Sequence, residues 1–555
     1  MCMVGATHDN TPSSCYLFVQ ATHTNPVRVP VTTMDAMLLS LIRNFLPNHR
    51  RPKQYRQKQS SPSFAVHTLK VSAPPPTFTA FVDGVRSSLM APLALDSLLA
   101  ISDALSHEYK EKLQVSDIAM LPSYQHRLPA GTEKGDYFTL DVGGSTLRIG
   151  LVRLAGTEPG EEPVQIHDIR SFPIDKGVRD LKGQDFFDWI ADRLLDALAA
   201  NGHTGASCGA TLDVGLTWSF AIEQTSSCSG RLLPMGKGFN ATQGVEEQEL
   251  NALLKTSCAT RNLAIETRAI INDGAAALLS QAYRDSSVRI SLVLGTGTNA
   301  AVYLPTSALG PGKFSARAST WHAARPSHVL VNTEMSLFGG NIFPKTCWDQ
   351  ELNAMHPKPD LQPLEYLSAG RYLGEIVRLI LVDGIRNHQL FQSRLPHRFD
   401  EPYSLSTHLL AIFESDTDPL LSRASAALQK SHPLRDNAKP TLADLEAIRT
   451  ISIAVTTRAS AYLACAMHAM WKLRTGAENL QLTDEQAKVA IACNGSIIEK
   501  FPNFKERMQR YLDQLVCGAD GANGAIDSGV RPATVVLEVV GESSVEGAAV
   551  ACACA

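Results

Sequence analysis

The residues whose types are best suited to binding or catalysis lie in one short segment, Asp141-Val-Gly-Gly-Ser-Thr-Leu-Arg148. An aspartate ends an apolar run, and two glycines, two hydroxyl residues and an arginine follow it. Glycine lets a ligand approach the backbone closely, successive backbone N–H groups bind anions, and a nearby carboxylate can hold Mg²⁺ through water. Alternating apolar residues on either side predict two paired strands. Taken alone, the segment fits both an anion-binding turn and an ordinary Gly-Gly hairpin.

A second segment repeats this plan. Apolar residues 290–294 lead into Gly295-Thr-Gly-Thr-Asn299, and a further strand pattern follows. Between the two segments, Asn272 and Asp273 end another apolar run and precede a stretch of small residues typical of a helix. Two such units suggest two halves that face one nucleotide, as in ATPases and sugar kinases that hold phosphates between paired hairpins.

The composition narrows the class of protein. The chain has 555 residues, of which 44% are hydrophobic and 19% charged, with a net charge of −4. This balance gives no reason to expect a nucleic acid or an acidic membrane surface as the main partner. Eleven cysteines without a CxxC pair predict neither a metal cluster nor a disulfide framework, and they suit a reducing compartment. No apolar run reaches the roughly 18 residues that span a bilayer. A soluble, cytoplasmic protein is therefore expected.

Residues 1–82 differ from the rest. They contain only two acidic residues, Asp9 and Asp35, and they include a basic cluster at 50–58. A transit peptide is one interpretation, but the single amphipathic piece lies far from the start, so a disordered tail is preferred. Beyond the tail, apolar spacing predicts an alternation of strands and helices. Strands are expected over 164–169, 213–220, 489–494 and 534–540. A helical pattern begins at about residue 81, and a second helix ends near residue 113. Further helices are expected over 184–199, 246–256, 275–283, 364–384, 442–474, 501–516 and 547–555.

In this order, the segments resemble the hexokinase family of ATP-dependent sugar kinases over about residues 85–555. No single motif is specific, and the likeness rests on the ordered set. The set comprises Met120–Tyr124, Leu128-Pro129, Asp141–Arg148, Trp218–Phe220, Lys237–Phe239, Asn272-Asp273, Gly295–Asn299, Glu334, Glu365, Tyr372–Leu379, Asn494–Ser496 and Gly547–Ala549.

The resemblance implies an α/β, two-lobed hexokinase/actin-like ATPase fold with a sugar- and ATP-binding cleft between the lobes. Residues 83–136 would form helices packed on the large lobe. Residues 137–271, completed by 540–555, would form the small α/β lobe, and residues 272–539 would form the large one.

The resemblance also implies a role for each motif. Phosphoryl transfer to a sugar hydroxyl needs positioning, charge stabilisation and one carboxylate base, and Asp273 is the expected base. Lys237 would supply positive charge in the transition state. The sugar would be held by Ser219, Phe220, Lys237, Asn272, Asp273, Asn299, Glu334 and Glu365. ATP would be held by Asp141, Gly143, Gly144, Ser145, Thr146, Arg148, Thr296, Gly297 and Thr298, with Asn494, Gly495 and Ser496 on the adenosine side. Mg²⁺ would arrive with ATP and contact Asp141 through water.

Several departures from the usual family pattern affect the substrate and ATP predictions. On the sugar and phosphate side, Ser145-Thr-Leu147 replaces Thr-Asn-Phe, Ala221 replaces a proline, and Gly236 stands where a threonine is usual. On the ATP side, Asn494 replaces an aspartate and Glu546 puts an acid where a base is common. The Ser-Thr hairpin, the Gly-Lys-Gly-Phe segment and the Asn-Gly-Ser turn together resemble a divergent fungal branch that includes N-acetylglucosamine kinases and hexokinase-like regulators. Gly236 removes side-chain volume beside Lys237, so N-acetylglucosamine is favoured over glucose for phosphorylation at the 6-hydroxyl.

Two other functions remain open. One is a general glucose hexokinase in glycolysis, and the other is a catalytically inactive sugar sensor that acts through protein partners. Retention of Asp273, Lys237, Glu334 and Glu365 favours an active kinase. A monomer or a homodimer without nucleic acid or membrane partners is expected.

Overall fold

The computed structural model describes three short strands near the N-terminus and most of the chain from residue 78. Apart from these strands, the described residues are 78–158, 160–200, 211–220, 222–233, 235, 239–315, 317, 325–435, 438–481, 484–521 and 534–555. The chain divides into two units, Met1–Val71 and Ser72–Ala555. In the first, β1 (Val4–Gly5), β2 (Tyr16–Val19) and β3 (Val27–Pro30) form an antiparallel sheet. The rest of the predicted disordered tail, up to residue 77, lies outside the described residues.

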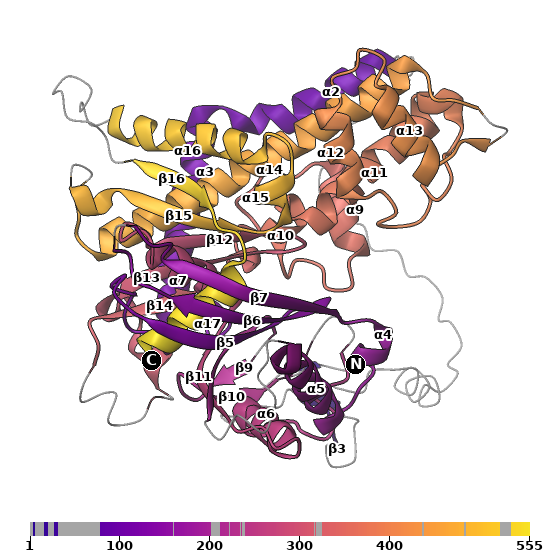
Figure 1. Cartoon of the computed structure of the whole chain (residues 1–555). Coiled ribbons are helices and arrows are strands. Elements are labelled where there is room, and N and C mark those ends of the chain that lie inside the picture. Colours follow the sequence, from indigo (N-terminus) through magenta and orange to yellow (C-terminus); the bar gives the residue numbers. More distant parts are fainter. Residues whose placement is uncertain are drawn as a thin grey trace. The chain divides into compact units, whose positions relative to one another are not determined.

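A five-stranded sheet in the second unit carries the first glycine segment (Figure 1). Its order is β11-β8-β5-β6-β7, with β5 (Gly135–Val142), β6 (Thr146–Leu154), β7 (Val164–Pro173), β8 (Leu212–Trp218) and β11 (Ile265–Ile271). The strands β5, β6 and β7 are antiparallel neighbours, whereas β8 runs parallel to β5 and β11. Helices α5 (Gln184–Ala200) and α6 (Leu250–Ala259) share a buried apolar cluster with this sheet. The predicted hairpin of Asp141–Arg148 is therefore the β5–β6 turn.

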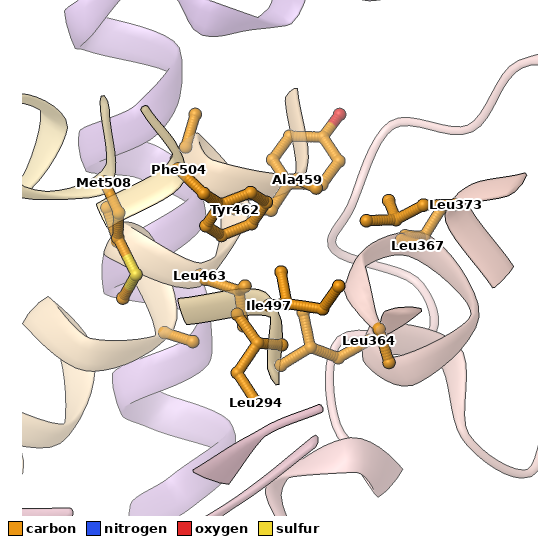
Figure 2. Packing of buried hydrophobic residues seen from close by; sticks show 14 of the residues in the cluster. Leu294, Leu364, Leu367, Leu373, Ala459, Tyr462, Leu463, Ile497, Phe504 and Met508 are labelled. Atoms are coloured by element: carbon orange, nitrogen blue, oxygen red, sulfur yellow. The ribbon is translucent and has the colours of Figure 1, made fainter. Parts of the chain in front are cut away.

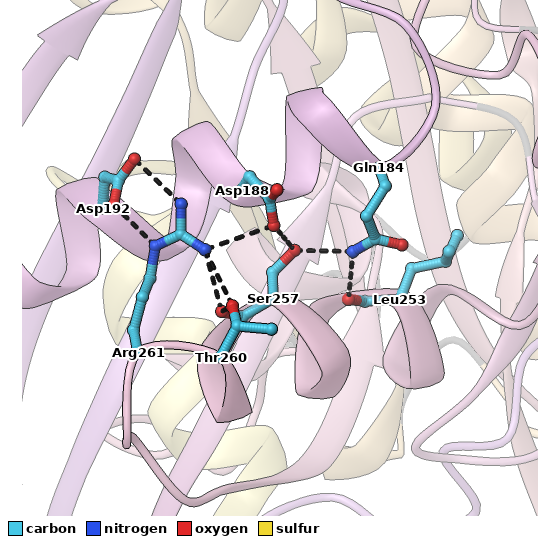
Figure 3. Close-up of polar contacts among 7 residues, drawn as sticks. All are labelled: Gln184, Asp188, Asp192, Leu253, Ser257, Thr260 and Arg261. Atoms are coloured by element: carbon cyan, nitrogen blue, oxygen red, sulfur yellow. Dashed lines mark hydrogen bonds and ion pairs between the residues drawn. The ribbon is translucent and has the colours of Figure 1, made fainter.

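Polar contacts join α5 to α6 and to Arg261, which follows α6 (Figure 3). The Arg261 guanidinium forms ion pairs with Asp188 and Asp192 of α5. The Gln184 amide donates hydrogen bonds to the Leu253 carbonyl oxygen, at 3.0 Å, and to the Ser257 hydroxyl, at 2.6 Å. Helix α6 begins at Leu250 rather than at the predicted residue 246, because residues 246–249 belong to a turn in which Glu247 has φ 63°.

A six-stranded sheet carries the second glycine segment. Its order is β16-β15-β12-β13-β14-β4, with β4 (Leu121–Pro122), β12 (Ile290–Leu294), β13 (Thr298–Pro305), β14 (His328–Asn332), β15 (Val489–Asn494) and β16 (Val535–Val539). The strands β12 and β13 are antiparallel, and β15 runs parallel to both β12 and β16. This second glycine segment is therefore also a hairpin turn.

Helices cover this second sheet and form the largest core. They are α2 (Phe78–Met90), α3 (Leu95–Val115), α9 (Cys347–Met355), α10 (Pro363–Ser368), α11 (Gly370–Asn387), α12 (Thr407–Ser415), α13 (Ser422–Ser431), α14 (Leu442–Ala477), α15 (Ser496–Lys500) and α16 (Phe504–Gly521). The long helix α14 begins at a Thr441–Asp444 capping box, which satisfies its first backbone N–H groups. Figure 2 shows Leu294 of β12, Leu364 of α10 and Leu463 of α14 packed together with Ile497.

The helices α7 (Asp273–Ala282) and α17 (Ser543–Cys554) join the two sheets. A third apolar cluster contains residues of both helices and of both sheets, including Ile271 and Ala301. The approach of α17 to α7 requires a glycine, because a Cβ atom on Gly547 would lie 2.1 Å from the Ala276 carbonyl oxygen. The protein thus has the two-lobed α/β architecture expected from the sequence.

Further boundaries also differ from the sequence prediction. Helix α2 already begins at Phe78, so the expected boundary at residue 82 falls inside it; Phe81 is buried in the core. Helix α17 begins at Ser543 rather than at residue 547. The helix predicted over 364–384 is broken at Ala369, whose backbone is extended (φ −84°, ψ 154°).

Within the described residues, no single helix is long and apolar enough to cross a membrane. The bent pair Phe78–Leu93 and Leu95–Val115, with 59° between its helices, passes by length and composition alone. Its residues Leu89 and Leu98 are fully buried in the core that contains α14.

Candidate active site

The first glycine turn is held closed by its own backbone. The Gly143 N–H donates to the Thr146 carbonyl oxygen at 3.0 Å, and the Ile174 N–H donates to the Ser145 carbonyl oxygen at 2.9 Å. A hydrogen bond of 3.2 Å from the Ser219 N–H to the Val142 carbonyl oxygen places Ser219 beside the end of β5. The predicted phosphate-side turn and the predicted sugar-side serine are therefore neighbours.

Asp141 and Arg148 face each other across this hairpin. The Arg148 Nε atom lies 3.1 Å from Asp141 Oδ2, and Arg148 Nη1 lies 2.9 Å from Glu542 Oε2. Asp141 is only 4% exposed, and burial raises the pKa of its carboxyl to about 6. Arg148 opposes that rise, whereas the charges of Asp273 and Glu542 add to it.

The predicted base lies at the start of α7. The Asn272 side chain caps this helix by accepting a hydrogen bond of 2.8 Å from the Ala275 N–H. Asp273 follows as the first helical residue, and its Oδ1 atom accepts from the Gly274 N–H at 2.8 Å. A carboxylate is stabilised at a helix N-terminus by the unpaired N–H groups of the first turn. Because the charge of Asp273 raises the pKa of both Asp141 and Glu334, this carboxylate lies within electrostatic reach of both lobes.

A chain of amides and carboxylates extends from the second hairpin. The Asn299 Nδ2 atom donates to Asn332 Oδ1 at 2.9 Å, and Asn332 Nδ2 donates to Glu334 Oε1 at 2.7 Å. Glu334 adopts a left-handed backbone (φ 50°, ψ 46°). Burial is the main cause that raises the pKa of the Glu334 carboxyl. Asn332 is absent from the predicted set, although its position at the end of β14 next to Glu334 was a usable signal.

Glu365 is fixed against the glycine turn itself. Its Oε2 atom accepts a hydrogen bond of 3.1 Å from the Thr298 N–H. A Cβ atom on Gly297 would lie 2.7 Å from the same oxygen, so only glycine lets Glu365 approach this closely. The turn is closed by a bond of 3.0 Å from the Gly295 N–H to the Gly297 carbonyl oxygen, while Thr296 is exposed.

The predicted adenosine turn lies against this second hairpin. Gly495 has φ +118°, and a Cβ atom there would lie 2.5 Å from the Leu294 carbonyl oxygen. A Cβ atom on Gly295 would lie 3.6 Å from the Ser496 N–H nitrogen. Asn494, which replaces the usual aspartate, donates to the Val540 carbonyl oxygen at 2.8 Å and to Glu499 Oε1 at 3.1 Å. Its side-chain amide therefore joins β15 to the chain that leads into α17.

The aromatic residue expected on the sugar side packs within its own lobe. The Phe220 ring lies 4.8 Å from the Phe239 ring and 5.4 Å from the Trp218 ring, measured between centroids. Lys237, Gly236 and Ala221 lie outside the described residues. Arg179, which no motif signals, donates to the Gly144 carbonyl oxygen at 3.1 Å and is the main described residue that the sequence interpretation missed.

The donors of the site fit an ATP–Mg²⁺ complex. The Thr298 hydroxyl is buried at the second hairpin without a hydrogen-bond partner, which leaves a donor for a ligand. Among the described residues, no group of three His, Cys, Asp or Glu side chains could hold a metal ion. A Mg²⁺ ion would therefore depend on nucleotide phosphates and water, with Asp141 as a candidate carboxylate.

Two lobes joined by α7 and α17, with paired glycine hairpins and a carboxylate at the start of α7, define a sugar kinase with the actin-like ATPase fold, a phosphotransferase that uses an alcohol group as acceptor. The chain belongs to the hexokinase family: the two hexokinase family models match residues 88–283 and 289–554.

Proteins named as hexokinases are similar to this chain over most of its length. The chain is 30% identical over 415 residues to the hexokinase of Schistosoma mansoni, covering 73% of this chain and 84% of that protein. It is 29% identical over 458 residues to hexokinase-2 of Oryza sativa subsp. japonica, covering 81% of this chain and 87% of that protein. The solved structure of the Schistosoma mansoni hexokinase complexed with glucose matches with a TM-score of 0.69 and 26% identity, over 86% of this chain and 99% of that one.

Proposed function

We propose that the protein transfers the γ-phosphoryl group of ATP to the 6-hydroxyl of a hexose. The observation that carries this proposal is the position of Asp273 at the N-terminus of α7, within electrostatic reach of Asp141 on one lobe and Glu334 on the other. The Asp273 carboxylate accepts the hydroxyl proton as the new O–P bond forms and the bond from phosphorus to the bridging oxygen of ADP breaks. A positioned base of this kind contributes about 10² to 10⁴ in rate.

The proposed sugar contacts follow from the polar chain around Asp273. Asn299, Asn332 and Glu334 are connected by hydrogen bonds, and a polyol needs such convergent amides and carboxylates. Ser219, Asn272 and Glu365 complete the proposed set, together with Lys237. The nucleotide contacts proposed are the two glycine turns, Arg148 and the turn Asn494–Ser496. The lobe boundaries at residues 137, 272 and 540 remain part of the proposal.

Glucose is the first sugar to test. The relatives above are named hexokinases, and one was solved with glucose. N-acetylglucosamine is the second candidate, because Gly236 leaves more room than the threonine usual in the family, and this position lies outside the described residues. An inactive sugar sensor is the third.

A coupled assay of ADP release separates these functions. Purified full-length protein with ATP, Mg²⁺ and either sugar is compared with Asp273→Asn, and glucose binding to both forms is measured by calorimetry. Turnover that falls at least about 100-fold in Asp273→Asn, with glucose affinity retained, supports the kinase. A higher kcat/KM for N-acetylglucosamine assigns that sugar instead, and binding without turnover by the wild type assigns the sensor.

We also propose a cytoplasmic location and a monomer or homodimer. An organellar location is the alternative, because the acid-poor composition of residues 1–82 is also typical of a transit peptide. Microscopy of the full chain fused at its C-terminus to a fluorescent protein, beside a fusion that lacks residues 1–77, tests the location. An organellar signal that disappears in the shorter fusion would contradict it.

A further inference from the structure

A guanidinium group lies against the first glycine turn, and none of the described acidic residues pairs with it. Arg179 ends the short helix α4 (Lys176–Arg179), and its Nη2 atom donates to the Gly144 carbonyl oxygen at 3.1 Å. No carboxylate of the described residues forms an ion pair with it, and its Nε atom is buried without a hydrogen-bond partner. A bound anion would compensate the positive charge of this half-buried group.

The strand register explains why Arg179 lies at this turn. Thr146 of β6 pairs with Pro173 at the end of β7, and the next residue, Ile174, donates its N–H to the Ser145 carbonyl oxygen at 2.9 Å. The Asp175 side chain then caps α4 by accepting from the Val178 N–H. The chain therefore passes directly from the β6–β7 pair to a one-turn helix that ends beside Gly144.

Arg179 also contacts the sugar side of the proposed site. Its carbonyl oxygen accepts a hydrogen bond of 2.9 Å from the Asn240 N–H, and its guanidinium carbon lies 5.8 Å from the centroid of the Phe239 ring. Phe239 in turn packs against Phe220. Arg179 thus stands between the glycine turn, which suits phosphate, and the aromatic pair beside Ser219.

We propose that Arg179 binds the phosphate of the sugar 6-phosphate product, and hence the phosphoryl group as it arrives on the sugar. This assignment rests on the proposed function for the identity of the ligand. The phosphate of such a product is covalently attached to the sugar, so it must lie between the sugar pocket and the glycine turn. A planar guanidinium can hold the Gly144 carbonyl oxygen with one N–H and a phosphate oxygen with others.

The test measures glucose 6-phosphate, glucose and MgADP binding by calorimetry for the full chain. Arg179→Met keeps the length of the side chain and removes its charge, and it is expected to weaken glucose 6-phosphate by at least about tenfold, since hydrogen bonds to charged groups are among the strongest. Glucose and MgADP affinities should change by less than about threefold. Arg179→Lys should recover part of the loss, because it restores the charge without the fork. Lys176→Met, an exposed change on the same helix, is the matched control.

Three results would overturn the assignment: unchanged glucose 6-phosphate affinity in Arg179→Met, an equal loss for all three ligands, or no recovery in Arg179→Lys. A chemical-protection measurement on the wild type tests the assignment even if the Arg179 variants do not fold. Glucose 6-phosphate, but not glucose, should protect Arg179 from phenylglyoxal, as read by peptide mass spectrometry, and equal labelling in both would also overturn it. If glucose 6-phosphate binding depends on Arg179 but the wild type shows no turnover, only the proposed kinase activity is refuted. If Arg179→Met changes neither turnover nor glucose 6-phosphate binding, only the assignment of Arg179 is refuted.

Discussion

Arg284 and Glu546 form a two-pronged ion pair that ties the end of α7 to the first turn of α17. The Arg284 Nη1 and Nη2 atoms lie 2.7 Å and 3.0 Å from Oε2 and Oε1 of Glu546. The Ser280 hydroxyl also donates to Glu546 Oε2 at 2.7 Å. Glu546 is the acid that stands where the family commonly has a base. Its charge is compensated inside the pair of helices, so this departure need not weaken nucleotide binding.

Breaking that pair should destabilise the protein, and exchanging its charges should restore part of the loss. The Glu546 side chain is 9% exposed, so Arg284→Ala leaves a buried carboxylate unpaired, at a cost of about 3 kcal/mol. Arg284→Glu combined with Glu546→Arg should recover more than half of the loss seen in either single reversal. Urea unfolding gives the four free energies. Lys176→Ala, which breaks the exposed pair with Asp180, should leave the free energy of unfolding almost unchanged. Additive effects of the two reversals would refute the coupling.

The sequence predicted the features of the site that are encoded locally. Buried strands precede both glycine turns, the Asn272-Asp273 pair and the Gly495 turn. Strand patterns and glycine positions can be recognised from a few consecutive residues. The hairpins β5–β6 and β12–β13 are confirmed. The family and the two-lobed fold followed from the order of these signals.

Contacts between distant segments could not be predicted in the same way. Arg179 lies 35 positions from Gly144 in the sequence, and a lone arginine in a polar stretch carries no periodic signal. The pairing of Arg284 with Glu546 spans 262 positions. Helical periodicity also continues through Ala369, where the tertiary contact of Gly370 with the second hairpin breaks the helix.

The break between α10 and α11 should be essential for the second glycine turn. The Gly370 N–H donates to the Gly295 carbonyl oxygen at 2.8 Å, and a Cβ atom on Gly370 would lie 2.7 Å from that oxygen and 2.9 Å from Ile497 Cδ1. Gly370→Ala must therefore displace the turn, and kcat/KM for ATP is expected to fall by about 100-fold, as misplacement of about 1 Å can cost. Steady-state kinetics measure this. Gly476→Ala, where the added atom meets nothing within 4 Å, is the matched control, and equal activity of the two variants would contradict the prediction.

The buried pair of Asp349 and Arg458 should stabilise the large lobe at neutral pH. The two side chains are 2% and 1% exposed, and Arg458 Nη1 and Nη2 lie 2.6 Å and 2.7 Å from the two carboxylate oxygens. Burial alone would raise the pKa of Asp349, but Arg458 and Thr346 outweigh it and hold the pKa below its ordinary value of 3.8. The pair therefore contributes stability above pH 3.8 and loses it only as the pH falls further.

Arg458→Met should remove about 3 to 5 kcal/mol at pH 7, because it leaves Asp349 charged and unpaired. Without the arginine, burial raises the pKa of Asp349, so the variant should recover relative to the wild type as the pH falls from 7 to about 4.5 and the carboxyl takes up a proton. Urea unfolding at several pH values tests both statements. A difference between variant and wild type that stays constant over this range would contradict the assigned role of Asp349.

The raised pKa of Asp141 should appear as an acid limb in the kinetics. Burial, Asp273 and Glu542 raise this pKa to about 6 against the opposing effect of Arg148, so the carboxylate gains a proton, and the site loses its negative charge, below that pH. We expect kcat/KM for ATP to fall as the pH drops through about 6. Glu542→Gln removes one cause of the rise and leaves Arg148 to Asp141 alone, so the limb should move to lower pH. Glu158→Gln, at an exposed acid, should leave the profile unchanged. A limb that does not move in Glu542→Gln, or that moves to higher pH, would show that Glu542 does not set the charge of Asp141.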